Sequence, residues 1–295
     1  MSINFLRYRK IYFIFSGILI VGSIICLFIF GLNPGIDFTG GSILEMEYEG
    51  PRPSNQAIKE SLAEFGSVYV QTSGENGLII RMKDISEQTH QEIVGILSEG
   101  YQAKEQRFES IGPSIGQELK QKTKVLAALA LLSIVLYIAF AFRRVQRPLK
   151  SWQYGIVSLL ALFHDVLIPV GVFSVLGKFY GVQITIPVIA ALLTVIGYSI
   201  NNVVVVFDRI RENLIRRIGV TFEETVNRSL NQTLTRCINT SLTTLFVLLA
   251  IFFFGGATLK YFALALIIGI LAGTYSSLFF ASPLLVAWLR WRQKT

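Results

Sequence analysis

Polar side chains recur inside apolar segments of this chain, where amide and ionisable groups are costly. Asn201 and Asn202 follow Tyr198 within one long apolar segment, and a second segment opens with Arg236 and carries Thr240 one turn further on. Polar groups at membrane depth normally face the interior of a helix bundle or a water-filled path. A guanidinium there needs an anionic partner, and amides can orient water. The two segments are therefore candidates for a transport or energy-coupling core.

One carboxylate lies well inside an apolar segment, at Asp165 directly after His164. A charged Asp at that depth costs about 2.5–3.5 kcal/mol on insertion scales, and burial favours its neutral form. A group that can be either neutral or charged suits a proton carrier. A structural His–Asp pair bonded to neighbouring backbone explains the same residues, and the sequence leaves both interpretations open.

Helical spacing gathers further small and polar residues into three stripes, since one face of a helix recurs every three or four positions. On the first polar segment we expect roughly one face to hold Ala191, Thr194, Tyr198, Asn201 and Asn202. The second polar segment has a similar stripe of Arg236, Asn239, Thr240, Thr243 and Thr244. Small residues, which let helix backbones approach closely, recur on the last apolar segment at Gly269, Gly273, Ser277 and Ala281. Packing is the better interpretation of the third stripe; packing and function both stay open for the first two.

The elements that carry these residues are six apolar runs, each long enough to cross a bilayer of about 30 Å. They are Ile11–Leu32, Val125–Phe142, Tyr154–Leu176, Ile184–Phe207, Ile238–Phe254 and Leu259–Leu289. The chain is 52% hydrophobic with a mean hydropathy of +0.55, which excludes an ordinary soluble domain. We expect an α-helical polytopic membrane protein whose first run is an uncleaved anchor, because no small-residue cleavage site follows it.

The net charge of +8 is concentrated at both termini and in alternate loops. By the positive-inside rule, both termini and the loops 143–152 and 208–236 are expected in the cytoplasm. The basic residues thus explain topology, and no nucleic-acid partner is expected. Asp208 and Arg209 are expected to be interfacial anchors, and the amphipathic stretch from Asp208 to Thr235 is expected to lie along the membrane surface, against lipid.

Residues 33–122 then lie outside, between the membrane segments of 1–32 and 123–295. Alternating apolar residues predict strands at Gly41–Tyr48, Val68–Thr72, Leu78–Met82 and Ala103–Ser110, and capped helical patterns predict helices at Ser54–Phe65 and Ser86–Leu97. That βαββαβ order is typical of a ferredoxin-like domain. Gly112–Gly116 breaks the chain before the second span, as a hinge or a plain linker.

Signals for enzyme chemistry are missing: there is no nucleophile–base pair, metal-ligand cluster or phosphate-binding loop. We therefore expect no enzyme, no metal and no cofactor. His90 lies on a polar helix and is expected to be solvated. Cys26 and Cys237 lie at or in different apolar runs, which implies no disulfide and favours buried, small hydrophobic side chains.

Several longer runs make the chain resemble the SecD/SecF family of bacterial protein-export membrane proteins, and within it the smaller, SecF-type members. These runs are Gly35–Gly41, His164–Val166, Gly197–Asn213, Thr233–Arg236, Thr240–Thr244 and Phe254–Gly256. Together they cover nearly the whole length.

The resemblance implies a partner and an energy source. A SecF-type chain is similar to half of a transporter of the resistance-nodulation-division type, with SecD as the other half. Such a pair associates with the SecYEG channel in the bacterial inner membrane and draws on the proton motive force to promote translocation of preprotein. The family's proton path lies between the halves, and Arg236 matches its intramembrane arginine, which faces an aspartate of SecD.

One position departs from the family pattern, which commonly has Asn-Asp where this chain has Asn201-Asn202. An amide cannot titrate, so SecD alone supplies the carboxylate, Asp165 contributes, or coupling is weak; the first is favoured. A scaffold subunit without proton flow and half of a small-molecule or lipid exporter are the alternative functions.

Overall fold

The computed structural model describes residues 3–141 and 148–294 of the 295-residue chain. The chain divides into two compact units. The helical unit comprises residues 1–32, 127–182 and 186–295, and the sheet unit comprises residues 33–126 and 183–185.

Six helices in the described part of the chain are long and apolar enough to cross a membrane, which confirms the expected spans as helices. They are α1 (Arg9–Phe30), α5 (Pro113–Ala141), α6 (Ser151–Tyr180), α7 (Ile186–Ile215), α8 (Phe222–Phe254) and the final helix, built from α9 (Ala257–Tyr275), η3 (Ser276–Ala281) and α10 (Ser282–Lys294). A short η1 (Phe5–Tyr8) precedes α1. The chain is therefore a multi-pass membrane protein with a small antiparallel sheet.

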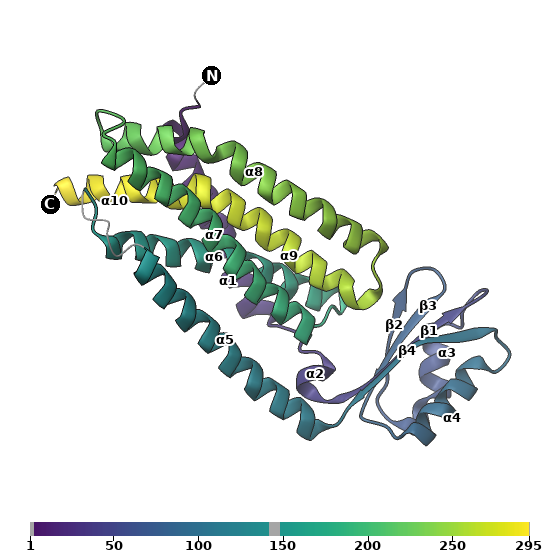
Figure 1. The fold of residues 1–295 in the computed structure, drawn as a ribbon. Coiled ribbons are helices and arrows are strands. Elements are labelled where there is room, and N and C mark those ends of the chain that lie inside the picture. The colour runs from purple at the N-terminus through teal and green to yellow at the C-terminus, as the bar shows by residue number, and fades with distance from the viewer. Residues whose placement is uncertain (1–2, 142–147, 295) are drawn as a thin grey trace. The chain divides into compact units, whose positions relative to one another are not determined.

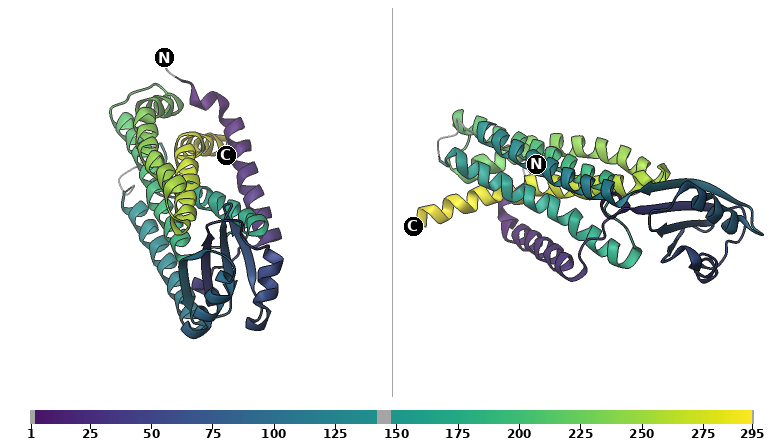
Figure 2. Two further views of the ribbon diagram at one scale, coloured as in Figure 1. Left: turned by 90° about the vertical axis from the view of Figure 1, so that its right-hand side faces the viewer. Right: turned by 90° about the horizontal axis from the view of Figure 1, so that it is seen from below.

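The centre of the helical unit is formed by α6, α7 and the final helix, each buried over about half of its most apolar stretch or more. α7 packs along α9, and α8 packs beside both (Figure 1). α1 runs along α6 (Figure 2) and leaves a large apolar face exposed. Apolar faces of this size are compatible with lipid, which solvates them as well as a protein core does.

The expected loop at 208–236 is wrong. α7 continues to Ile215 and α8 already begins at Phe222, so the two helices form a hairpin with a short turn. Ile210 and Leu230 are fully buried in the core between them. The Asn213 amide donates to the Ser229 hydroxyl at 2.8 Å. The amphipathic spacing thus marks the packed face of two extended spans rather than a helix lying on a membrane.

The expected loop at 143–152 is only partly described, because residues 142–147 lie outside the described part of the chain. Arg143, Arg144 and Arg147, which supported a cytoplasmic position for this loop, are among them. α6 begins at Ser151, within the expected loop.

The predicted break at Gly112–Gly116 lies at a helix start. Pro113 is the first residue of α5, and the Gly116 N–H donates to the Gly112 carbonyl at 3.0 Å. Proline is favoured in the first helical turn, where its missing N–H costs nothing. The motif therefore lies at the start of α5 and not in a separate linker.

The final helix contains a π-helical turn at Ser276–Ala281. Pro283 follows it and lacks the backbone N–H that would continue the α-helical pattern. The Ser282 hydroxyl donates to the Ser277 carbonyl at 3.0 Å. Single π-turns inside α-helices often occur at functional sites.

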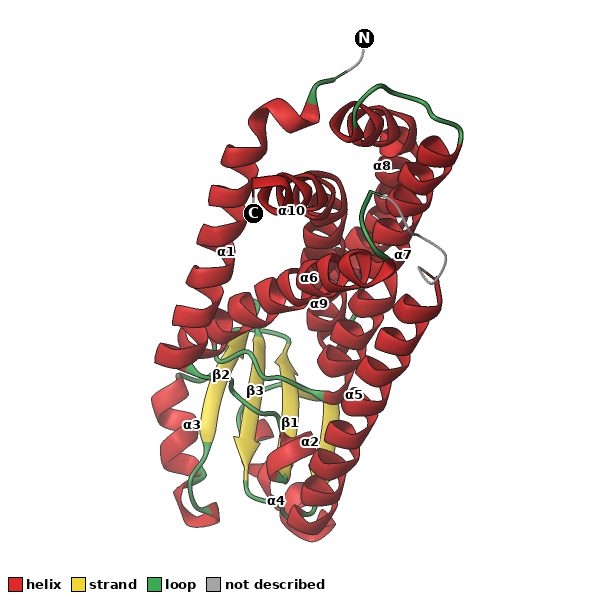
Figure 3. Cartoon of the chain, turned by 90° about the vertical axis from the view of Figure 1, so that its left-hand side faces the viewer, coloured by secondary structure: helices red, strands yellow, loops and turns green. Residues whose placement is uncertain are grey.

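The sheet unit is built on four antiparallel strands in the order β2-β3-β1-β4 (Figure 3). They are β1 (Gly41–Tyr48), β2 (Tyr69–Ser73), β3 (Gly77–Met82) and β4 (Ala103–Ile111). The helices α3 (Asn55–Ser61) and α4 (Glu87–Ser98) follow β1 and β3 along the chain. Alternate strand residues such as Leu44, Met46 and Ile80 meet Ile58 and Ile93 of the helices in one core.

His90 is buried, contrary to the expectation of a solvated side chain: only 4% of it is exposed. Its Nδ1 and Nε2 atoms lie 3.1 Å from carboxylate oxygens of Glu87 and Glu105. Its ring stacks on Phe108 with 3.7 Å between centroids. The polar neighbours on α4 hid this position, although His90 lies three residues before Ile93 on the apolar face of that helix.

Two glycines shape the start of β1, after the short α2 (Ile36–Thr39). Gly40 has φ +72° and Gly41 has φ +124°, a region that side chains with a Cβ rarely adopt. A Cβ on Gly40 would lie 2.8 Å from Cα of Pro113. Nearby, the Ile184 carbonyl accepts a bond of 2.8 Å from the Gly35 N–H. The segment after α1 therefore packs against the start of α5 and is hydrogen-bonded to the connection between α6 and α7.

Candidate functional site

The residues of the α7 stripe divide between two faces of the helix. Ala191 and Asn202 are buried, whereas Thr194 and Asn201 are exposed and Tyr198 is half-buried. Consecutive helical residues are about 100° apart, so neighbouring asparagines cannot share a face. The expectation of one common face is therefore wrong, and only Thr194, Tyr198 and Asn201 lie toward the outside of this chain.

The α8 stripe is largely exposed, including Arg236, Asn239 and Thr240. The Tyr198 hydroxyl of α7 donates to the Thr240 carbonyl at 3.0 Å and so joins the two stripes. We call these exposed residues, together with the half-buried Tyr198, the α7–α8 polar face; it consists of Thr194, Tyr198, Asn201, Arg236, Asn239, Thr240 and Thr243. Among the described residues, no hydrogen bond or ion pair reaches the Arg236 guanidinium.

A second polar site, which we call the Asp165 cluster, lies inside the bundle and consists of His164, Asp165, Ser199 and Ser276, all at most 1% exposed. His164 Nδ1 lies 2.8 Å from Asp165 Oδ1. Asp165 Oδ2 accepts hydrogen bonds from Ser276 at 2.7 Å and from Ser199. The cluster therefore connects α6, α7 and the π-turn. The alternative from the sequence, a His–Asp pair bonded only to neighbouring backbone, would not connect these elements.

Two buried polar atoms near these groups have no partner in the described part of the chain: Nε2 of His164 and Nδ2 of Asn202. Asn202 lies one turn after Ser199 on the buried side of α7. Buried polar atoms normally find partners, so each exception calls for an explanation. The two serines were not singled out by sequence, although each lies three positions from a predicted site residue, Ser199 from Asn202 and Ser276 from Gly273.

The predicted glycine stripe lies where α9 meets α7. A Cβ on Gly269 would collide with the Val195 side chain. A Cβ on Gly273 would lie 3.2 Å from Cβ of Ser199 and 3.4 Å from Asp165 Oδ2. Ser277 belongs to the π-turn, where its hydroxyl donates to the Thr274 carbonyl at 3.0 Å. The close approach of α9 to α7 therefore also brings the backbone of α9 against the Asp165 carboxylate.

The predicted interfacial residues form ion pairs along α7. Arg211 lies 3.4 Å from Asp208, and Arg209 lies 2.7 Å from Glu212. All four side chains are at least one-third exposed. Such pairs contribute little to stability, and their position at the membrane interface remains a prediction.

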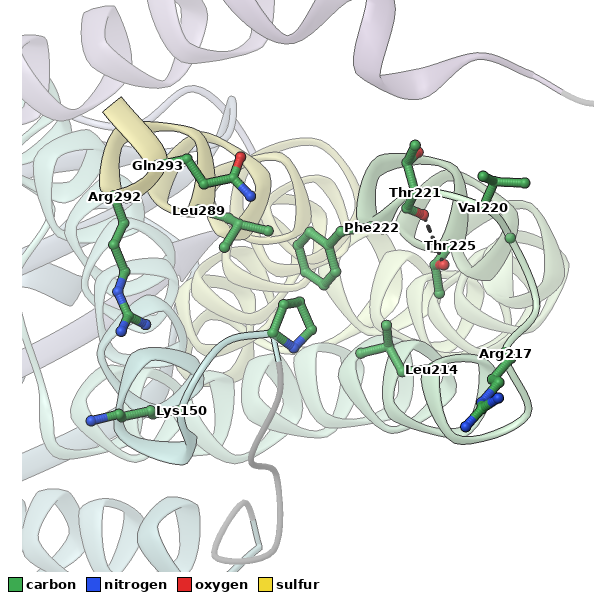
Figure 4. Close-up of a pocket in the computed structure, with 12 residues that line it drawn as sticks. Lys150, Leu214, Arg217, Val220, Thr221, Phe222, Thr225, Leu289, Arg292 and Gln293 are labelled. Carbon is green, nitrogen blue, oxygen red and sulfur yellow. Dashed lines mark hydrogen bonds between the residues drawn. The ribbon is translucent and has the colours of Figure 1, made fainter. Parts of the chain in front are cut away.

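A hollow of about 960 Å³ lies at the end of the helical unit where α7 turns into α8. Leu214, Phe222 and Leu289 form its apolar part, and Lys150 and Arg292 lie on one side of it (Figure 4). None of the sequence-predicted site residues lines this hollow. Among the described residues, no three His, Cys, Asp or Glu side chains are grouped so that they could hold a metal ion.

Two family models match the sequence. The model for the C-terminal part of protein export membrane proteins SecD and SecF matches residues 94–291. The model for the SecD/SecF GG motif matches residues 27–51, which include Gly40 and Gly41.

Related proteins match over nearly the whole chain. The protein translocase subunit SecF of Thermobaculum terrenum is 44% identical over 301 residues, which cover 97% of this chain and 94% of that protein. The protein translocase subunit SecDF of Thermus thermophilus is 38% identical over 269 residues, which cover 88% of this chain and 35% of that protein.

A solved structure has a similar fold. The crystal structure of SecDF from Thermus, described as a translocon-associated membrane protein, matches with a TM-score of 0.85 at 36% identity. The match covers 98% of this chain and 39% of the other. This chain therefore spans well under half the length of that relative.

Proposed function

Because this chain belongs to the SecD/SecF family of protein-export membrane proteins, we propose that it is the SecF-type subunit of a SecD–SecF complex in a bacterial inner membrane. The complex uses the proton motive force to promote translocation of preprotein through the SecYEG channel. The names of the relatives, protein translocase subunits, support a role in the Sec pathway.

The observation that carries the proposal is the α7–α8 polar face, with Arg236 unpaired on it among the described residues. A guanidinium exposed on a membrane helix is unfavourable in lipid unless it meets an anionic group or water. A carboxylate supplied by SecD satisfies this requirement and provides a group that can titrate. The Thermus relative, named SecDF and much longer than this chain, supports a partnership of this kind.

The proposal includes a topology. Basic residues near both termini and at the α7–α8 turn favour a cytoplasmic position for these parts. The sheet unit then lies on the outer side. The strand order β2-β3-β1-β4, with α3 and α4 inserted after β1 and β3, supports a ferredoxin-like arrangement of that unit.

A scaffold role without proton coupling is the second candidate, favoured by one observation. Asn202 cannot titrate, and it is buried rather than exposed on the α7–α8 polar face. If SecD supplies no carboxylate opposite Arg236, the described part of this chain offers none on that face.

Preprotein translocation into vesicles tests the proposal. Vesicles would contain the channel and SecD, with or without this chain, and an imposed proton gradient would be compared with none. We expect the gradient to raise the translocated fraction only when this chain is present. Equal translocation with and without the gradient in its presence would favour the scaffold, and no effect of the chain on preprotein would exclude both.

A further inference from the structure

We propose that the His164–Asp165 pair is a proton-binding site of this subunit's own, inside the bundle and separate from the α7–α8 polar face. The inference rests on the proposed function, since it names where this chain itself holds a proton. Asp165 is the one carboxylate that is completely buried among the described residues. A completely buried carboxylate must be paired with hydrogen-bond donors or a positive charge, be protonated, or alternate between these two states.

The hydrogen bonds of the Asp165 cluster show where a proton can be added. Ser199 and Ser276 both donate to Oδ2 of Asp165, so that oxygen accepts two bonds. Oδ1 and His164 Nδ1 lie 2.8 Å apart, a hydrogen-bond distance, and the proposal places one proton between them. The nitrogen still able to take a proton is Nε2 of His164, which is buried and has no partner in the described part of the chain.

The step is a simple association. A proton bonds to the lone pair of His164 Nε2 and changes the pair from a carboxylate beside a neutral imidazole to a carboxylate beside an imidazolium. The net charge of the cluster changes from negative to neutral, which burial favours. Release of the same proton reverses the step.

The surroundings contain few other groups that titrate. α9 brings Tyr275, whose ring stacks beside His164 with 6.1 Å between centroids, and η3 brings the ring of Phe280 at 5.3 Å. α1 brings Tyr12, whose carbonyl accepts the Tyr275 hydroxyl at 3.1 Å. α7 brings Ser199, which bonds Asp165 and does not ionise. No hydrogen bond or ion pair links the described Lys, Arg and Glu side chains to the pair.

The cluster is placed so that its charge acts on two helices at once. Ser276 begins the π-turn of the final helix, and Ser199 belongs to α7. α7 also carries Asn201 on the α7–α8 polar face. A proton at His164 therefore changes the electrostatic energy of the contact between α6, α7 and the π-turn, which a purely structural pair would keep constant.

The chain contains two histidines, which makes a direct test possible. Full-length chain with isotope-labelled histidine, in complex with SecD, would be followed by nitrogen NMR, and a His90→Gln variant would assign the His164 signals. We expect the nitrogen signals of His164 to show both a neutral and a protonated ring among samples prepared between about pH 5 and about pH 8. A single protonation state across that range would overturn the proposal.

Two variants separate titration from structure. Asp165→Asn keeps the size of the side chain and removes its charge, and we expect loss of the imidazolium form of His164 and of gradient-dependent translocation. Ser276→Ala removes one hydrogen bond and no titrating group, so both forms of the His164 ring should still be seen. If Ser276→Ala abolishes the titration as completely as Asp165→Asn, the role is structural. If wild-type vesicles show no gradient dependence, the proposed function fails, while the NMR result still decides whether the pair titrates.

Discussion

The carboxylate of Asp165 and the amide of Asn202 lie on neighbouring helices, and only the first can exchange a proton. The sequence singled out both residues because they are polar within apolar runs. It could not show that Asn202 is on the buried side of α7 and Asn201 on the exposed side, because helical spacing gives relative angles and not the direction of the core. His164 was singled out as a neighbour of Asp165, but the two serine partners, Ser199 and Ser276, were missed because serines are common in membrane helices.

Replacing Asn202 with Asp tests how this position relates to the cluster. The Nδ2 atom that the change removes has no partner in the described part of the chain, so no hydrogen bond is lost. We expect normal protein levels and a translocation activity that falls more at alkaline pH than in the wild type, because a charged carboxylate here is buried one turn after Ser199, which bonds Asp165. Gradient-driven translocation would be measured across pH. No activity at any pH, with normal levels of the variant, would contradict the prediction.

His90→Ala is expected to destabilise the sheet unit by about 1–3 kcal/mol, because it removes the stacking on Phe108 and leaves Glu105 without its partner. Resistance of the full chain to limited proteolysis under increasing urea would measure the loss. Gln88→Ala, on an exposed part of the same helix, is the control and should change little. Equal behaviour of the two variants would show that the buried histidine contributes nothing.

The hydrogen bonds around Glu87, one of the partners of His90, also make the stability of the sheet unit depend on pH. The direction of the shift in the Glu87 pKa determines whether stability rises or falls with pH. Hydrogen bonds from Gln91 and then from His90 lower the pKa of Glu87 below its ordinary value. The stabilisation from charged Glu87 is therefore complete above its ordinary pKa and is lost as the pH falls through the lowered value.

At the scale of elements, helix and strand positions followed from apolar periodicity, but helix lengths did not. The stretch from Asp208 to Thr235 has an amphipathic pattern that an interfacial helix and an extended helical hairpin share. The burial of Ile210 and Leu230 decides between them. The π-turn left no sequence signal beyond Pro283, because one extra residue in a turn changes the periodicity too little to detect.

Gly269→Ala is expected to destabilise the helical unit by about 1–3 kcal/mol, since the added Cβ collides with Val195 of α7 and forces α9 away. Gly22→Ala is the matched control on α1, where a Cβ would meet nothing within 4 Å. The thermal stability of the purified full chain in detergent would be compared for both variants. A Gly269→Ala protein as stable as the control would show that α7 and α9 do not pack as closely as described.

At the scale of the whole molecule, the exposed surfaces of the helical unit differ in polarity. Apolar surfaces of α1, α5 and α8 can face lipid, but the α7–α8 polar face cannot do so without cost. Sequence alone predicted a partner from the single arginine near membrane depth. It could not establish which residues accompany Arg236 on the exposed surface, because that depends on how α7 and α8 are rotated in the bundle.

Gradient-dependent translocation by an Arg236→Ala variant tests the central claim most directly. Wild type, Arg236→Ala and Arg228→Ala would be compared in vesicles with SecD and the channel, with and without an imposed proton gradient. Arg228 is also exposed on α8, two turns before Arg236, and controls for the loss of one positive charge. We predict that the gradient stimulates the wild type and Arg228→Ala and has no effect on Arg236→Ala. Equal stimulation of all three proteins would contradict proton coupling through the α7–α8 polar face.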